Sequence, residues 1–280
     1  MRERMHRLFL LFLFGATTSL RAAPPDTLAP TPTVPAAAAE AGKDVVHQLN
    51  NAFAKVFEII APSVVIIEIT KKNDGSDASS LDDLFFQNQP DENSPHGNPR
   101  GNPPLQSEGS GFIIRPDGFI FTNDHVLDGA ERIDVKLKDG REFQGKIVGR
   151  DEKTDVAVIK IDATNLPVAH FGDSDQVRVG QFAFAIGAPF KLDYTFTFGV
   201  ISGKGRNKLL DNAGYSISDY LQTDASINPG NSGGPVVDAR GRVVAVASAK
   251  FEGSGIEALS LGIPVQTACI MVVACFLSPD

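Results

Sequence analysis

The sequence has little cysteine, no surplus of basic residues and no long hydrophobic run. Two cysteines, Cys269 and Cys275, occur in 280 residues, and their spacing suits neither a zinc knuckle nor a catalytic thiol beside a histidine. Buried free thiols are therefore expected in preference to a disulfide, and no metal or cofactor is expected. Lys and Arg total 26 against 34 Asp and Glu, so nucleic acid is not an expected partner, because phosphate binding needs clustered cations.

The apolar run at the N-terminus is too short to span a bilayer. Arginines at its start precede the run from Leu8 to Phe14, so residues 1–22 are predicted to be a secretory signal peptide. Cleavage after Ala22 places Leu20 where a small residue is usual, and an uncleaved N-terminal anchor, with membrane association, is the alternative. In both cases the protein is expected to be exported.

The remaining composition is ordinary for a folded domain, with 42% hydrophobic and 21% charged residues. Residues 23–43, rich in Ala and Pro, predict a flexible linker. Apolar residues at helical spacing predict an amphipathic helix from Asp44 to Ile60, packed on the first of two barrels. Residues 266–280 form an atypical apolar tail, which is either a final helix on the barrel or the product of a truncated or altered reading frame.

Residues 44–265 contain short β-branched and aromatic runs between turn residues, a pattern that favours closed barrels over a βαβ sheet. Two series of six strands predict barrels at about 44–162 and 168–265. The first series covers 63–69, 111–114, 119–122, 133–137, 143–148 and 156–161, interrupted by a long polar loop at 71–107. The second covers 181–186, 195–203, 215–223, 235–237, 243–248 and 259–264. The predicted fold class is all-β, a double six-stranded barrel with an N-terminal amphipathic helix.

The most informative stretch of the chain ends in the turn Gly230-Asn231-Ser232-Gly233-Gly234-Pro235. Its glycines let the backbone bend sharply enough to aim several N–H groups at one point beside the Ser232 hydroxyl. A serine hydroxyl is a poor nucleophile unless an imidazole takes its proton and a carboxylate orients that imidazole. His125 and Asp155, both at the ends of predicted strands, supply these two groups.

Each of the three residues also has an ordinary interpretation. The glycine-rich segment is compatible with a simple turn, His125 with a structural histidine and Asp155 with a strand-end cap. Their order along the chain, however, is that of chymotrypsin-like double barrels. Together they predict a catalytic triad in the cleft between two barrels, with the backbone N–H groups of Gly230, Asn231 and Ser232 as an oxyanion hole.

The motifs resemble those of the HtrA (Deg, DegP-like) family of envelope serine proteases, over about Phe53 to about Pro264. The resemblance implies a trypsin-like protease domain and an exported serine endopeptidase of the periplasm or cell envelope. It further implies action on unfolded polypeptides in protein quality control, and a homotrimer. A pocket near Ile227 and the loop after Ser248 is expected to prefer small aliphatic side chains.

A basic substrate residue before the scissile bond is not expected. Trypsin-like pockets for Lys or Arg carry a carboxylate six positions before the nucleophile, and Ser226 stands there.

The chain also departs from the family's pattern. In the segment 187–193, which corresponds to the activation loop, Ala188 replaces Asn or Ser and Lys191 replaces Gly. The Phe85-Phe86 pair corresponds to loop aromatics that touch neighbouring subunits, and the PDZ domains of family members are not expected here. The alternative function is therefore a proteolytically inactive or resting binder of unfolded polypeptides. A barrel scaffold without proteolytic activity is a third interpretation.

Overall fold

A computed structural model gives the fold of the chain and describes residues 36–71, 105–187, 194–206, 219–228, 230–250 and 259–271. Contacts divide the chain into the units Met1–Asp44 and Val45–Asp280, and the described strands all belong to the second unit. The predicted signal peptide, the Phe85-Phe86 pair, residues 188–193 of the activation loop and Cys275 lie outside the described residues.

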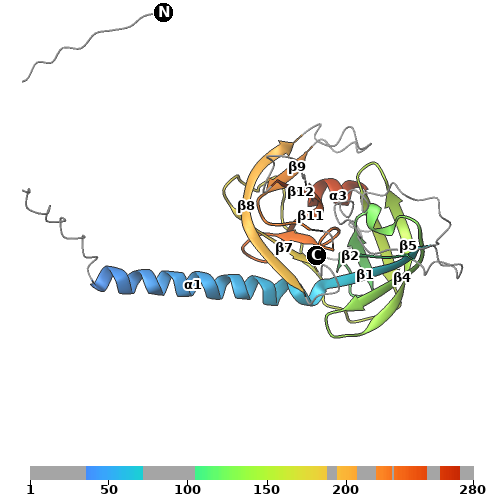
Figure 1. Ribbon diagram of the computed structural model, residues 1–280, viewed down its shortest axis with the longest axis horizontal. Helices are drawn as coiled ribbons and strands as arrows, with labels where there is room; N and C mark the ends of the chain where they lie inside the picture. The colour runs from blue at the N-terminus through green and yellow to red at the C-terminus, as the bar shows by residue number, and fades with distance from the viewer. Residues whose placement is uncertain are drawn as a thin grey trace, which may run out of the picture. The chain divides into compact units, whose positions relative to one another are not determined.

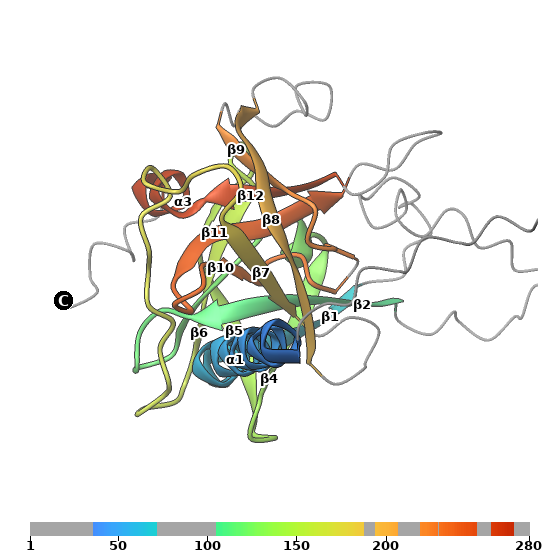
Figure 2. The same cartoon turned by 90° about the vertical axis from the view of Figure 1, so that its left-hand side faces the viewer.

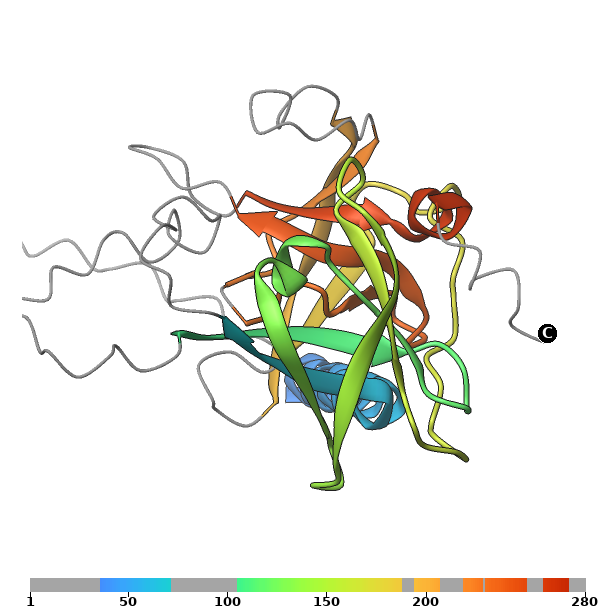
Figure 3. The ribbon, with the colours of Figure 1, turned by 90° about the vertical axis from the view of Figure 1, so that its right-hand side faces the viewer.

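Among the described residues, the strands form two closed antiparallel barrels, which lie side by side in Figure 1. The first has the order β1-β2-β3-β6-β5-β4 and consists of β1 (Val64–Lys71), β2 (Leu105–Ile113), β3 (Phe119–Thr122), β4 (Ala130–Leu137), β5 (Glu142–Asp151) and β6 (Val156–Ile161). The second has the order β10-β11-β12-β9-β8-β7 and consists of β7 (Phe182–Gly187), β8 (Thr195–Arg206), β9 (Tyr220–Thr223), β10 (Pro235–Val237), β11 (Val243–Lys250) and β12 (Ser260–Pro264). The predicted all-β double barrel is confirmed, and Figure 3 shows the first barrel in front of the second.

Strand β1 is apolar along most of its length because it lies between two apolar environments, the interior of the first barrel and a second buried cluster. In β1, Val65, Ile67 and Ile69 point into the first barrel. The adjacent Val64 belongs to a different cluster, because successive side chains of a strand point to opposite faces. At its start, β1 therefore buries side chains on both of its faces, whereas Glu68 further along is exposed.

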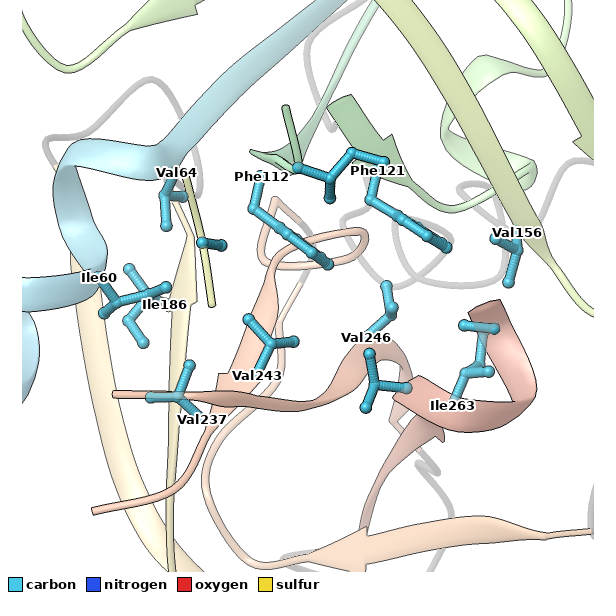
Figure 4. Packing of buried hydrophobic residues seen from close by; sticks show 14 of the residues in the cluster. Ile60, Val64, Phe112, Phe121, Val156, Ile186, Val237, Val243, Val246 and Ile263 are labelled. Carbon is cyan, nitrogen blue, oxygen red and sulfur yellow. The ribbon is translucent and has the colours of Figure 1, made fainter. Parts of the chain in front are cut away.

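A buried cluster joins the two barrels, and we call it the inter-barrel cluster. It combines side chains of both barrels with the C-terminal part of α1 (Ala36–Ile60), and Figure 4 shows among them Ile60, Val64, Phe112, Phe121, Val156, Ile186, Val237, Val243, Val246 and Ile263. The rings of Phe112 and Phe121 stack with their centroids 5.6 Å apart. Removing this apolar surface from water holds one barrel against the other.

The N-terminal helix α1 is longer than predicted and contacts both barrels. It begins at Ala36, inside the predicted linker, because its opening alanines favour helix over extended chain. The ring centroid of Phe53 lies 5.3, 5.0 and 4.9 Å from those of Phe182, Phe184 and Phe198 on β7 and β8. The helix, seen end on in Figure 2, therefore packs on the second barrel as well as on first-barrel side chains of the inter-barrel cluster, so the predicted contact with the first barrel is only part of its packing.

Strand β2 begins earlier than its sequence predicts. Polar residues precede its apolar run, so the prediction placed the strand start at Gly111 and residues up to 107 in a loop. In the structure β2 pairs with β1 from Leu105, opposite Lys71, to Phe112, opposite Val64. Backbone pairing needs no apolar side chain, so the neighbouring strand decides where β2 starts.

Helix α3 (Val265–Met271) shows that the first part of the apolar tail packs on the domain. Val265 and Ala268 are buried in the inter-barrel cluster. The predicted end of the protease domain at residue 265 therefore coincides with the start of α3 and does not follow the last element of the domain. Cys269 is partly buried there, and the state of the two thiols stays a prediction. No helix in the described part of the chain combines the length and apolarity needed to cross a membrane.

We expect Phe112→Ala to lower the free energy of unfolding by about 3–5 kcal/mol, because it leaves a cavity between the barrels. Val148→Ala, on an exposed side chain of β5, is the matched control and should change it by less than about 0.5 kcal/mol. Urea denaturation followed by circular dichroism measures both. A loss for Phe112→Ala no larger than that of the control would contradict the role assigned to the inter-barrel cluster.

Candidate active site

Strand pairing brings the predicted histidine and aspartate together at the rim of the first barrel. β3 and β6 are antiparallel neighbours, with Thr122 opposite Ala157, so the residues just after β3 and just before β6 meet. His125 begins the one-turn helix η2 (His125–Leu127) after β3, and Asp155 precedes β6. The Nδ1 atom of His125 lies 2.8 Å from Oδ1 and 2.9 Å from Oδ2 of Asp155, and the backbone N–H of His125 donates to Oδ1 at 3.0 Å.

Several contacts fix the orientation of Asp155. The residue is 1% exposed and has a φ of 53°, a left-handed conformation that Asp adopts more readily than most side-chain-bearing residues. Asn123 donates from Nδ2 to the carbonyl of Asp155 at 2.8 Å, and Ser248 donates from Oγ to Oδ2 at 2.7 Å. A carboxylate only accepts hydrogen bonds, so Nδ1 of His125 carries a proton and Nε2 is the basic atom of the neutral ring.

Ser232 reaches this pair from the second barrel, in the turn between β9 and β10. Its Oγ donates to the carbonyl of Ser248 at 3.3 Å, and the residue is 8% exposed. Ser248 on β11 therefore contacts Asp155 through its hydroxyl and Ser232 through its carbonyl. The structure thus gathers His125, Asp155 and Ser232 around a fourth residue that the sequence did not predict, because nothing local distinguishes Ser248 within an apolar strand.

The Ser232 turn lies directly against strand β2 of the first barrel. The backbone N–H of Ser110 donates to the carbonyl of Ser232 at 2.9 Å, and the Ser110 hydroxyl donates to the carbonyl of Gly230 at 2.5 Å. Thr122 donates in turn to the carbonyl of Ser110 at 2.8 Å. Gly233 has a φ of 82°, and a Cβ there would lie 2.2 Å from the Ser110 carbonyl oxygen, so this contact requires glycine.

One backbone N–H group of the predicted oxyanion hole already has an acceptor within the turn. The backbone N–H of Asn231 already donates to the carbonyl of Asn228 at 2.9 Å, within the turn itself. This bond engages the Asn231 N–H within the turn, so Gly230 and Ser232 are the donors that the geometry favours, and the oxyanion hole of Gly230, Asn231 and Ser232 stays a prediction. Gly230 has a φ of 98°, a backbone conformation that few residues other than glycine adopt.

Ile227 does not line an open pocket. Its side chain is 1% exposed and packs inside the second barrel, and its N–H donates to the Ser260 hydroxyl at 3.3 Å. The assignment of Ile227 to a substrate-binding pocket stays a prediction. An apolar residue between turn residues is equally compatible with a pocket wall and with the core, so the sequence could not distinguish them. Residues 251–258, after β11, lie outside the described residues.

A buried phenol lies near Asp155. Tyr220 on β9 belongs to the inter-barrel cluster, and burial raises the pKa of its hydroxyl, with a smaller contribution from the charge of Asp155. The Tyr220 side chain therefore stays neutral and adds no charge near the site. In the described segments, no group of three or more His, Cys, Asp and Glu side chains is arranged to hold a metal ion.

Comparison with known proteins supports the class that this fold and site define. The family model described as "Trypsin-like peptidase domain" matches residues 109–246. A protein of Chlamydia muridarum (strain MoPn / Nigg) named "Probable periplasmic serine endoprotease DegP-like" is 41% identical over 227 residues, which cover 76% of this chain and 45% of that protein. A protein of the same name from Hahella chejuensis (strain KCTC 2396) is 42% identical over 222 residues, covering 77% and 46%.

Solved structures agree with these relatives. The HtrA-type protease AlgW with a tripeptide has a TM-score of 0.63 and 36% sequence identity, covering 78% of this chain and 61% of that one. The chain thus carries a trypsin-like peptidase domain. Its homologues are the HtrA-type, DegP-like serine endoproteases, and it spans about half the length of the curated relatives described above.

We expect Ser248→Ala to lower kcat for a peptide substrate by roughly tenfold or more, because hydrogen bonds to charged groups contribute about 1.5–3 kcal/mol. The loss arises from a carboxylate that no longer holds His125 firmly, so KM should change little. Ser248→Thr keeps the hydroxyl and is the matched control. Steady-state kinetics that give the same kcat for both variants would contradict the role of the Ser248 hydroxyl.

Proposed function

We propose that this domain is a serine endopeptidase that hydrolyses peptide bonds through an acyl-enzyme. The observation that carries the proposal is the buried, two-oxygen contact between the Asp155 carboxylate and Nδ1 of His125, linked to Ser232 through Ser248. The names of the homologues support the same reaction class.

In this mechanism Oγ of Ser232 attacks the substrate carbonyl carbon while Nε2 of His125 takes the hydroxyl proton. Asp155 stabilises the resulting imidazolium, and the N–H groups of Gly230 and Ser232 donate to the oxyanion. The C–N bond then breaks as His125 returns the proton to the leaving amine. A water molecule, deprotonated by His125, attacks the acyl-enzyme, which releases the carboxylic acid and restores the serine.

A second candidate function has one observation in its favour. The Ser232 hydroxyl lies 3.3 Å from the carbonyl oxygen of Ser248, so this backbone oxygen competes with the His125 imidazole for the hydroxyl proton. Such an arrangement is suited to a resting protein that binds unfolded polypeptides without cleaving them.

We expect Ser232→Ala to reduce cleavage of unfolded casein by roughly a million-fold, the loss found when a triad serine is removed from a measured protease. The variant should unfold at the same urea concentration as the wild type, because the substitution removes only a small hydroxyl group and its long hydrogen bond to the Ser248 carbonyl. Gel electrophoresis over time measures cleavage. Cleavage that persists in the variant would overturn the assignment of Ser232. A wild type that suppresses aggregation without cleaving casein would favour the second candidate.

We further propose that the protein acts outside the cytoplasm, in the periplasm or cell envelope, on unfolded polypeptides in protein quality control. The arginines followed by an apolar run at the N-terminus support export, and the homologues are named periplasmic. Ser226, exposed and without charge, supports a preference for substrate residues other than Lys and Arg.

We also propose that three copies of the chain associate. An exposed apolar surface, which we call the α1 patch, consists of Val45, Val46, Leu49, Phe182 and Phe198. Phe182 and Phe198 are 40% and 53% exposed, and both contact Phe53, one helical turn from Leu49. Exposed apolar side chains gathered in this way mark protein interfaces, and the number of three copies is taken from the resemblance to the HtrA family.

We expect Phe198→Asp to shift the protein from trimer to monomer, because burying an unpaired carboxylate against apolar neighbours is costly. Val148→Asp is the matched control, since Val148 is similarly exposed at 54% but lies on β5 of the first barrel. Analytical ultracentrifugation at micromolar concentration measures the mass. A trimer that survives Phe198→Asp, or a monomeric wild type, would contradict the proposed interface.

A further inference from the structure

A single arginine contacts both ends of the turn that carries His125. From β5, Arg150 donates through Nε to Oδ1 of Asp124 at 2.5 Å and through Nη2 to Oδ2 at 3.0 Å. The same Nη2 donates to Oδ1 of Asp128 at 2.6 Å and approaches the carbonyl of Asp124 at 3.4 Å. The planar guanidinium therefore binds one carboxylate with two nitrogens and reaches a second.

These two carboxylates belong to the residues that flank the one-turn helix η2. Asp124 is its N-cap and directly precedes His125. Asp128 is its C-cap, and its backbone N–H donates to the carbonyl of His125 at 3.2 Å. Arg150 thus holds both ends of the turn against β5.

The same strand leads to the partner of His125. Arg150 pairs with Ala157 on β6, two residues after Asp155. A side chain anchored at Arg150 is therefore fixed to the strand pair that presents the Asp155 carboxylate. Contacts from Arg150 set the position of η2 relative to that carboxylate.

Charge gives Arg150 a second effect. The side chain of Asp124 is 6% exposed, against 35% for Arg150, and a buried carboxylate is costly unless it is paired. Its hydrogen bonds to Asp124 raise the pKa of Arg150, so the guanidinium stays charged. Other charged groups lie around η2 in the described part of the chain: the carboxylates of Asp128 at its end and Asp155 before β6, and the side chain of Lys71, which packs beside Gly129 just after η2.

We propose that Arg150 is a positioning residue for His125 in the endopeptidase reaction proposed above, on which this inference rests. Its guanidinium fixes η2 relative to Asp155 and cancels the negative charge of Asp124, the residue that directly precedes His125. Arg150 acts through Asp124 and Asp128 and touches no reacting atom.

Two separable consequences follow from removing the guanidinium. Loss of the contacts lets η2 shift, and displacement of a catalytic group by about 1 Å can cost roughly a hundredfold in rate. Loss of the cation leaves Asp124 uncancelled, which favours the imidazolium and raises the pKa of His125 in the variant. Because the base must be neutral to accept a proton, a raised pKa moves the acid limb of kcat/KM to higher pH.

Variants of Arg150 and Asp124 distinguish the effect of Arg150 on the position of η2 from the effect of its charge on His125. Arg150→Met should lower kcat by about ten- to a hundredfold and move the acid limb upward by about half to one pH unit. Arg150→Lys keeps the positive charge but loses the planar guanidinium that donates from two nitrogens. The acid limb should therefore stay at its wild-type position, while kcat is still reduced. Arg150→Met combined with Asp124→Asn removes both charges and should also return the acid limb to its wild-type position.

Arg132→Met is the matched control. Arg132 forms a similar pair with Asp134 on β4 of the same barrel, at 3.0 Å through Nε and 2.8 Å through Nη2. Its loss should leave kcat and the acid limb unchanged. Kinetics of a peptide substrate between pH 5 and 9 give both quantities for every variant, and Arg150→Lys keeps the test available if Arg150→Met does not fold.

A readout without turnover distinguishes failure of this inference from failure of the proposed function. In the Ser232→Ala protein, NMR titration of the imidazole protons of His125, assigned by comparison with His125→Gln, gives its pKa directly. A wild-type protein without peptidase activity would contradict the proposed function. A His125 pKa that is higher in Arg150→Met than in the protein with Arg150 would still support the electrostatic effect of Arg150. The inference is overturned if Arg150→Met and Arg132→Met give the same kcat, acid limb and His125 pKa.

Discussion

The hydrogen bonds between the Ser232 turn and strand β2 are the contact on which the rest of the site depends. Ser232 belongs to one barrel, while His125 and Asp155 belong to the other, so the site exists only if the barrels keep a fixed relation. The inter-barrel cluster supplies apolar attraction, which has little directionality. The bonds from Ser110 to Ser232 and Gly230 add direction, since they form only in one register. Gly233 makes that approach possible because it places no side chain against the Ser110 carbonyl.

Around this contact, other residues hold the three residues of the proposed triad in place. Ser248 connects Asp155 to Ser232 across the two barrels. Arg150 anchors the turn that begins with His125. Asn123 holds the backbone of Asp155, whose left-handed conformation places its carboxylate toward the imidazole. A catalytic side chain on a short turn needs such supports, because the turn has few hydrogen bonds of its own.

The sequence predicted the number and order of strands well because alternation and turn residues are local signals. It failed where a neighbour decides the outcome. The polar start of β2 looks like a loop until β1 pairs with it. The helix before β1 was predicted on the first barrel, and only the folded chain shows that Phe53 meets Phe182, Phe184 and Phe198 of the second. Ile227 was assigned to a pocket because its position beside the serine turn suggests one, whereas its burial depends on strands far away in the sequence.

By itself, the sequence determined which chemical groups are present, in which order, and that they lie at the ends of short strands in two barrels. These properties follow from residue type and short-range periodicity. Only the tertiary structure decided that Ser248 joins the site, that Arg150 reaches both ends of η2, and that the Asn231 N–H is used within its own turn. The reason is physical: each of these depends on where a hydrogen-bond partner lies, and Ser248 and Arg150 bind residues 93 and 26 positions away that only strand pairing brings within reach.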